Sequence, residues 1–286
     1  IYDCNYIYDS ELNFQSVYNH KCYRAFYSHH CRGCLDVYFC RYSANLANCF
    51  GCIGLKNKSY CVFNKQLSRQ GYEKFIAEAN LGSYAQIHTW QTDMQKFSAA
   101  FPRKYSWNSN TVSTSGEYIS NSKNVVHSYF VDGGENIKYG YFLYGSAKDS
   151  YDYFRFSNNS QLIYESMGCG TNVANLSFCF HCYPNCYNLA YCMNCSSSSN
   201  LFGCFGVKNK QYCILNTQYT KAEYEQLVPN IIKHMNAMPY MDDRGRVYKY
   251  GEFFPMEFSP LAYNESIASE FFPISKDEAI ARGYNW

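Results

Sequence analysis

The sixteen cysteines are the residues of this sequence with the widest range of chemistry. They fall into two groups, within residues 4–61 and 169–213, and no cysteine lies between the groups or after the second one. A cysteine thiol can bind a metal ion, form a disulfide, act as a nucleophile or fill a small space in an apolar core. The spacing of the cysteines must decide among these roles.

Two Cys-x2-Cys pairs in the first group have a spacing close to that of a zinc ribbon. Cys31 and Cys34 form the first pair, Cys49 and Cys52 form the second, and fourteen residues separate the pairs. Four thiolates at such spacing can bind one zinc ion with tetrahedral geometry. We therefore predict Cys31, Cys34, Cys49 and Cys52 as candidate metal ligands, with zinc as the one cofactor that the sequence indicates.

An internal repeat argues against this metal site. Residues 50–61 and 202–213 share the pattern Phe-Gly-Cys-x-Gly-x-Lys-Asn-Lys-x-Tyr-Cys, at an offset of 152 residues. At the four candidate ligand positions the second copy has, in order, Tyr183, Cys186, Leu201 and Cys204. Two ligands are lost while the surrounding motif persists. We therefore prefer a ladder of buried thiols, in which cysteines act as small hydrophobic side chains. Metal binding and disulfides stay open as alternatives.

Histidines beside two cysteines could extend a metal site or activate a nucleophile. His29 and His30 precede Cys31, and His181 precedes Cys182. However, sequence neighbours on a strand point to opposite faces, so His181 and Cys182 are badly placed for proton transfer. The sequence shows no catalytic residues, and we predict that the protein is not an enzyme.

The elements that must position these cysteines are predicted from composition and period. The 31 Tyr among an aromatic content of 19%, with abundant Asn, Ser and Gly, indicate many short strands joined by tight turns. Cysteines recur at steps of 18 and nine residues. We predict a mainly β fold, a β-solenoid or β-helix-like repeat with short helical elaborations. Cys34 should then stack on Cys52, one coil of ~4.8 Å away, and Cys186 on Cys204.

Two related modules are predicted from the internal repeat. Residues 1–107 form a Cys-rich solenoid module with a helical extension, and residues 108–286 form a second module with a C-terminal helical cap. In residues 118–165, Asn, Asp and Gln precede apolar strands every 12 or 13 residues, which predicts larger coils or hairpins there. Apolar stripes at helical spacing follow residue 87, and capping patterns begin at Thr220 and Ser275.

Charge and hydropathy limit the partners. The net charge of +2 gives no basic patch for nucleic acid, which we do not expect as a partner. No apolar run reaches the ~18 residues of a membrane span, and the first residues do not resemble a signal peptide. The compartment stays unknown; reduced thiols would favour the cytoplasm. A second copy of the chain or another protein is the expected partner, through a long face or an open terminal coil.

Four stretches of the chain carry a resemblance to a known family. They are residues 49–61 (Cys-Phe-Gly-Cys-x-Gly-x-Lys-Asn-Lys-x-Tyr-Cys), 219–225 (Tyr-Thr-Lys-Ala-Glu-Tyr-Glu), 259–265 (Ser-Pro-Leu-Ala-Tyr-Asn-Glu) and 279–284 (Ala-Ile-Ala-Arg-Gly-Tyr). Over essentially its whole length the chain resembles an uncharacterised family of Cys/Tyr/Asn-rich repeat proteins from ultra-small bacteria known mainly through metagenomes.

The resemblance implies a central cysteine ladder flanked by zinc-ribbon-like ends. This sequence lacks those ends, so the resemblance implies that it is part of a longer protein and that zinc belongs to the missing parts. Residues 108–165 depart from the family pattern, because relatives carry more cysteines there. A regular metal array is therefore less expected, and the resemblance implies no activity.

The function that the sequence predicts is a non-enzymatic structural or binding scaffold, built on a Cys/Tyr ladder and able to self-associate. A metal-binding or redox thiol module is the first alternative. The second is a polysaccharide-acting β-helix enzyme that uses acidic residues on one face, although no such carboxylate pair is located by the sequence.

Overall fold

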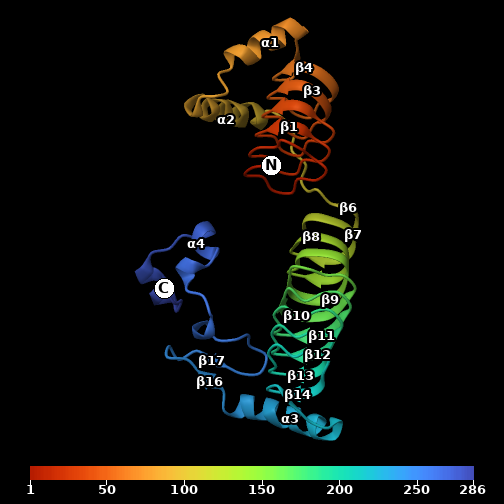
Figure 1. Ribbon diagram of the computed structural model, residues 1–286, viewed down its shortest axis with the longest axis vertical. Coiled ribbons are helices and arrows are strands. Elements are labelled where there is room, and N and C mark those ends of the chain that lie inside the picture. The colour runs from red at the N-terminus through yellow and green to blue at the C-terminus, as the bar shows by residue number, and fades with distance from the viewer. The chain divides into compact units, whose positions relative to one another are not determined.

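The computed structural model describes all residues, 1–286 (Figure 1). The chain is mainly β, as its composition predicts, and its two large sheets are almost entirely parallel. It divides into two compact units, Ile1–Lys104 and Tyr105–Trp286. Each unit is described by itself.

The first unit contains a five-stranded sheet in the order β1-β2-β3-β4-β5. Its strands are β1 (Tyr23–Phe26), β2 (Leu35–Tyr38), β3 (Ala44–Phe50), β4 (Lys56–Val62) and β5 (Lys65–Gln66). Strands β1 to β4 pair in parallel, and β5 turns back to pair antiparallel with β4. Before β1, isolated parallel bridges continue the same pairing from Tyr2 onward.

The second unit contains a ten-stranded sheet, in which the strands from β6 to β15 are neighbours in chain order. They are β6 (Ser109–Val112), β7 (Gly116–Val126), β8 (Ser128–Lys138), β9 (Tyr141–Phe154), β10 (Ser160–Met167), β11 (Val173–Ser177), β12 (Cys186–Ala190), β13 (Ser199–Phe202), β14 (Gln211–Ile214) and β15 (Thr217–Gln218). All pairs are parallel except β14 with β15.

Strand partners are a fixed number of residues apart. In the first unit they are twelve apart, as for Cys49 and Cys61. In the second unit most are twelve or thirteen apart, as for Leu201 with Cys213 and Val173 with Cys186. We call the stretch between a residue and its partner a coil. The predicted 18-residue period is therefore wrong, because 18 residues make one and a half coils. The 12- and 13-residue spacing in residues 118–165 is the coil itself, and β7, β8 and β9 pair in parallel instead of forming hairpins.

The wrong period has a physical origin in a smaller unit of three residues. In the first unit every third residue from Asp3 to Phe63 has left-handed backbone, with φ of 49° at Asp3 and 54° at Tyr6. From Asn13 to Cys52 the residue after each left-handed one is buried. A coil of twelve residues therefore has four inward positions. Cysteines placed at inward positions show steps of nine and 18 although no coil has either length.

The left-handed positions also explain why the sequence is rich in Asn. Most side chains are strained at positive φ, whereas Asn, Asp and Gly tolerate it. Asn45 and Asn48 occupy such positions at φ of 52° and 53°, and Gly51 follows at 62°. The Asn-rich turns predicted from composition are therefore single left-handed residues within the coils.

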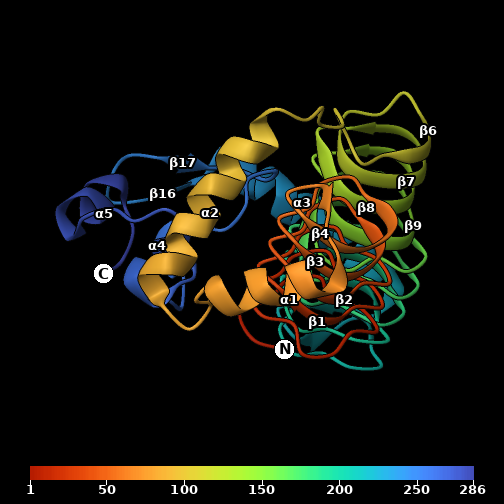
Figure 2. The same ribbon diagram turned by 90° about the horizontal axis from the view of Figure 1, so that it is seen from above.

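Helices close one end of each set of coils. In the first unit α1 (Arg69–Glu78) and α2 (Tyr84–Ala99) follow β5, and Figure 2 shows α1 across the coils with α2 continuing from it. Ile87 and Met94 of α2 lie in one apolar cluster with Phe39 and Phe50 of the coils. The stripe predicted after residue 87 is thus a packing face.

In the second unit, the coils are followed by α3 (Lys221–Ala237), which contacts β14. Thr220 and Glu223 form the predicted capping box, and the helix continues through Pro229. The remaining elements are β16 (Tyr240–Met241), β17 (Val247–Tyr248), η1 (Met256–Phe258), η2 (Tyr263–Glu265), α4 (Ala268–Phe271) and α5 (Lys276–Arg282). Ser275 caps the start of α5, and Gly283, with a φ of 94°, caps its end.

Candidate functional site

The inward residues stack on one another from coil to coil, and we call each such stack a column. In the second unit two neighbouring columns consist largely of cysteine. The first runs through Cys169, Cys182 and Cys195, and the second runs through Cys179, Cys192 and Cys204. None of these six side chains is more than 1% exposed. We call them the six-thiol array.

Columns of the first unit mix cysteine with other buried side chains. Three pairs of cysteines are column neighbours: Cys22 with Cys34, Cys40 with Cys52, and Cys49 with Cys61. The stacking predicted for Cys34 on Cys52 is therefore wrong, since Cys34 lies beside Leu46 in the register of β2 and β3. In the second unit Cys186 likewise lies beside Val173 and not beside Cys204.

The four predicted zinc ligands occupy four different columns. Cys31 and Cys34 lie in one coil, and Cys49 and Cys52 lie in the next. All four are buried. No three His, Cys, Asp or Glu side chains of the chain form a group that could hold a metal ion. His181 is exposed on the outside of the coils, so it does not extend a site around the buried Cys182. Zinc at these residues stays a prediction, without support from their arrangement.

The thiol S–H groups donate hydrogen bonds to backbone carbonyls inside the coils. Each buried cysteine lies near the carbonyl two residues before it, and most also lie near a carbonyl nine or ten residues after it. The Cys31 Sγ lies 3.6 Å from the His29 carbonyl oxygen and 3.5 Å from that of Cys40. Burial raises the pKa of Cys186 to about 11 and also raises that of Cys40. Protonated, buried thiols of this kind are poor nucleophiles and poor metal ligands.

The inward residues also solve a problem of backbone hydrogen bonding. In each group of three residues, two N–H groups reach carbonyls of adjacent coils, as Tyr8 N does to Asn19 O at 3.0 Å. The N–H of the inward residue points into the interior. For Cys22 its acceptor is the Ser10 Oγ at 2.9 Å, and for Cys31 it is the Asn19 Oδ1 at 3.0 Å. The Cys182 N–H lies 3.4 Å from the Cys169 Sγ.

Small side chains with an acceptor atom are therefore favoured inside the coils, because a buried N–H without a partner is costly. Ser, Asn and Cys meet both requirements. This role was missed by the sequence reasoning, which treated cysteine as a hydrophobic residue alone. The signal was present as the recurrence of Ser, Asn and Cys at most of the positions spaced three residues apart from Cys4 to Cys52.

A substitution at Ser28 tests this account. Ser28 is fully buried, and its Oγ accepts from the Cys40 N–H at 3.1 Å. We expect Ser28→Ala to lower the free energy of unfolding by about 1–3 kcal/mol, since the Cys40 N–H loses its acceptor. Ser28→Cys should lower the free energy of unfolding by less, because its sulfur lies in a similar position and is still a weak acceptor. Denaturant unfolding monitored by circular dichroism measures both, and equal losses would contradict the role of the acceptor.

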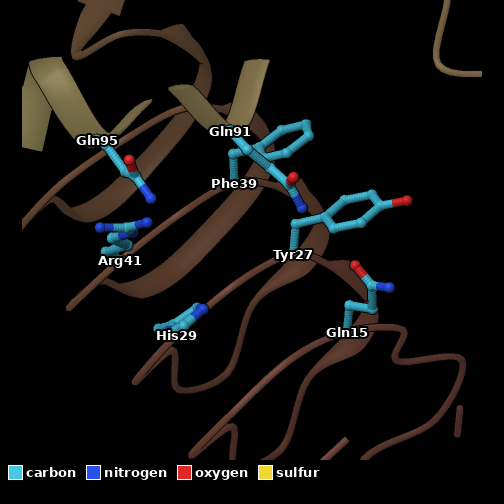
Figure 3. Close-up of a pocket in the computed structure, with 7 residues that line it drawn as sticks. All are labelled: Gln15, Tyr27, His29, Phe39, Arg41, Gln91 and Gln95. Atoms are coloured by element: carbon cyan, nitrogen blue, oxygen red, sulfur yellow. The ribbon is translucent and has the colours of Figure 1, made fainter. Parts of the chain in front are cut away.

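A second candidate site is a pocket on the outer side of the first unit, with a volume of about 380 Å³ (Figure 3). It is lined by Gln15, Tyr27, His29, Phe39 and Arg41 of the coils and by Gln91 and Gln95 of α2. Only His29 among these residues was singled out from the sequence. The others come from distant parts of the chain, and their types form no motif.

The chain matches no family model, and it matches no curated protein. None of its helices has the length and hydrophobicity needed to cross a lipid bilayer.

Proposed function

We propose that the chain is a non-enzymatic β-solenoid scaffold, whose coils hold regular outer rows for contact with a second copy or another protein. The observation that carries the proposal is the contrast between interior and surface. Fifteen of the sixteen cysteines are buried, so the chemically reactive groups face inward. The outer side chains repeat at the spacing of the coils, which suits an extended binding surface.

The outer rows are of two kinds. An aromatic row in the first unit stacks Tyr6, Tyr18, His30 and Tyr42, with ring centroids 4.7, 4.8 and 5.3 Å apart in order. In the second unit the exposed amides of Asn159, Asn172 and Asn185 form a row, with hydrogen bonds of 2.8 and 3.3 Å. Such rows fix the outer side chains in place before any partner binds, which lowers the entropy cost of binding.

The resemblance to the Cys/Tyr/Asn-rich family is consistent with this proposed scaffold. A shared ladder core would account for the family's composition, since each coil needs small acceptors inside and left-handed Asn outside. A reducing compartment such as the cytoplasm fits thiols that serve as packing groups.

Thiol reactivity of the folded protein tests the scaffold. We expect a bulky thiol reagent to modify at most one cysteine rapidly, because only Cys4 is half-buried while the others are buried. All sixteen should react after unfolding in denaturant. Mass spectrometry of the modified protein counts the adducts.

The matched control is Cys4→Ser, which should remove the rapid adduct without changing the rest. Rapid modification of several cysteines in this variant, under conditions where circular dichroism shows a folded chain, would count against a scaffold. It would favour a module that works through its thiols.

A redox thiol module is the second candidate, favoured by the six-thiol array. A hydrogen bond from Cys192 lowers the pKa of Cys204 to about 7, although burial opposes the shift. Column neighbours one coil apart, at ~4.8 Å, are within the Cα range of a disulfide. Oxidised glutathione could then take two electrons and two protons from two thiols, giving one disulfide and two molecules of glutathione. Loss of thiols in pairs without loss of fold would support this function, and no loss would reject it.

A further inference from the structure

The pocket of Figure 3 contains a positive charge that the protein does not neutralise. Arg41 lies in its wall, forms no ion pair, and donates from Nη1 to the Ser98 Oγ at 3.3 Å. The buried Nε–H of Arg41 has no hydrogen-bond acceptor in the protein. No Asp or Glu lines the pocket. A partly buried guanidinium that has no carboxylate beside it and whose Nε–H has no acceptor is costly, so this arrangement calls for an anion.

The other polar groups of the pocket are neutral and can donate hydrogen bonds. In Figure 3 the amide of Gln95 is directed toward the Arg41 guanidinium, and that of Gln91 lies near Tyr27. Burial, and then the charge of Arg41, lower the pKa of His29. Its ring is therefore neutral at pH 7 and keeps one N–H. Arg103 adds positive charge near Arg41.

An aromatic wall adjoins these polar groups. Tyr27 and Phe39 stack face to face, with ring centroids 4.8 Å apart and an interplanar angle of 7°. Phe39 is 2% exposed and is held in place by the apolar cluster under α2. The wall is thus rigid, and a flat apolar group could lie against the ring of Tyr27.

We propose that this pocket binds a small organic molecule that carries an oxyanion, a carboxylate or a phosphate, on a flat apolar body. Arg41 binds the oxyanion through its unused N–H groups. The amides of Gln91 and Gln95 complete its hydrogen bonds, and the flat body lies against Tyr27. A volume of about 380 Å³ suits a molecule of one or two rings. The site belongs to the first unit alone and does not depend on the scaffold function proposed above.

The test measures binding of three probes to the full chain by isothermal titration calorimetry. Benzoate and phenyl phosphate carry an oxyanion on one ring, and benzamide is the neutral counterpart. We expect at least one anion to bind with a dissociation constant on the order of millimolar or below. It should bind about tenfold more tightly than benzamide, because a charged, hydrogen-bonded pair adds binding energy that the neutral probe lacks. The tighter anion identifies the oxyanion as carboxylate or phosphate. Equal binding of all three probes, or no binding, would overturn the proposal.

Two variants locate the binding. Arg41→Gln should weaken the anion about tenfold or more, because the charge and the paired N–H groups are lost. Arg32→Gln is the matched control, since Arg32 occupies the equivalent position of another group of three residues and is exposed. It should leave binding unchanged. Equal effects of the two variants would show nonspecific attraction and reject the site.

A third variant covers the case in which Arg41→Gln does not fold. Gln95→Ala removes an exposed amide of α2 and keeps the charge. We expect it to weaken anion binding severalfold while circular dichroism shows a folded protein. Unchanged binding of the anions in Gln95→Ala would place them outside this pocket.

Discussion

Replacing Leu176 with Ala is expected to lower the free energy of unfolding by about 2–5 kcal/mol, the cost of a cavity in a tightly packed core. Leu176 is fully buried in the aliphatic column of the second unit. Its column neighbours are Ile163 and Leu189, in the strands on either side. Each coil contributes few inward residues, so neighbouring side chains have little freedom to fill the space. Denaturant unfolding of the full chain measures the loss.

Leu162→Ala is the matched control for this cavity. Leu162 lies next to Ile163 in β10 but is 53% exposed. It should change the free energy of unfolding by no more than about 0.5 kcal/mol. Similar losses of unfolding free energy in the two variants would mean that Leu176 and Leu162 do not differ in burial as described.

Enlarging a thiol should harm the six-thiol array more than deleting it. Cys192 is fully buried between Cys179 and Cys204. We expect Cys192→Leu to cost about 1–3 kcal/mol or more, since the added carbons have no space. Cys192→Ala removes one sulfur atom and should cost about 1 kcal/mol. Unfolding in plain buffer, and in buffer with reductant and chelator, measures both variants.

The comparison of buffers separates packing from bonding. If Cys192 took part in a disulfide or a metal site, Cys192→Ala would cost several kcal/mol in plain buffer, because the cross-link or metal would be lost as well. That loss would shrink when reductant and chelator are present. A cost that is mild and equal in both buffers is the result expected for a packing group.

Composition and capping patterns were sufficient to predict the β class and the starts of α3 and α5. Tyr, Phe, Val and Ile with Asn-rich turns predicted short strands, and the Thr220 and Ser275 caps are formed as expected. These features depend on residues close together in sequence. Local preferences therefore specified them without knowledge of the coil.

The coil length was not predictable from the cysteines because their period is not that of the coil. In the first unit inward positions recur every three residues, so any set of them yields multiples of three. The pairing of Cys49 with Cys61 shows that a coil has twelve residues. Steps of 18 residues are more frequent among the cysteines, and they indicated the wrong period. The 12-residue spacing of Asn124 and Asn136 was the true signal, and their side chains are joined by a hydrogen bond of 3.0 Å.

The pocket around Arg41 could not be predicted for a different reason. It combines Arg41 with Gln91 and Gln95, which lie some fifty residues further along the chain. Their proximity depends on how α2 packs over Phe39. The apolar stripe after residue 87 indicates that α2 packs on other elements, but not which coils it covers. Sites built across separate elements from common polar residues leave no motif.

The central claim is that the cysteines stabilise the coils as buried thiols, without metal or disulfide. The most direct test is the free energy of unfolding of the unmodified protein, in plain buffer and in buffer containing reductant and a strong chelator. The account predicts the same value in both, within about 0.5 kcal/mol, the scale of changes outside a core. A fall of about 2 kcal/mol or more on adding reductant and chelator would contradict it, because that is the stabilisation a disulfide or bound metal supplies.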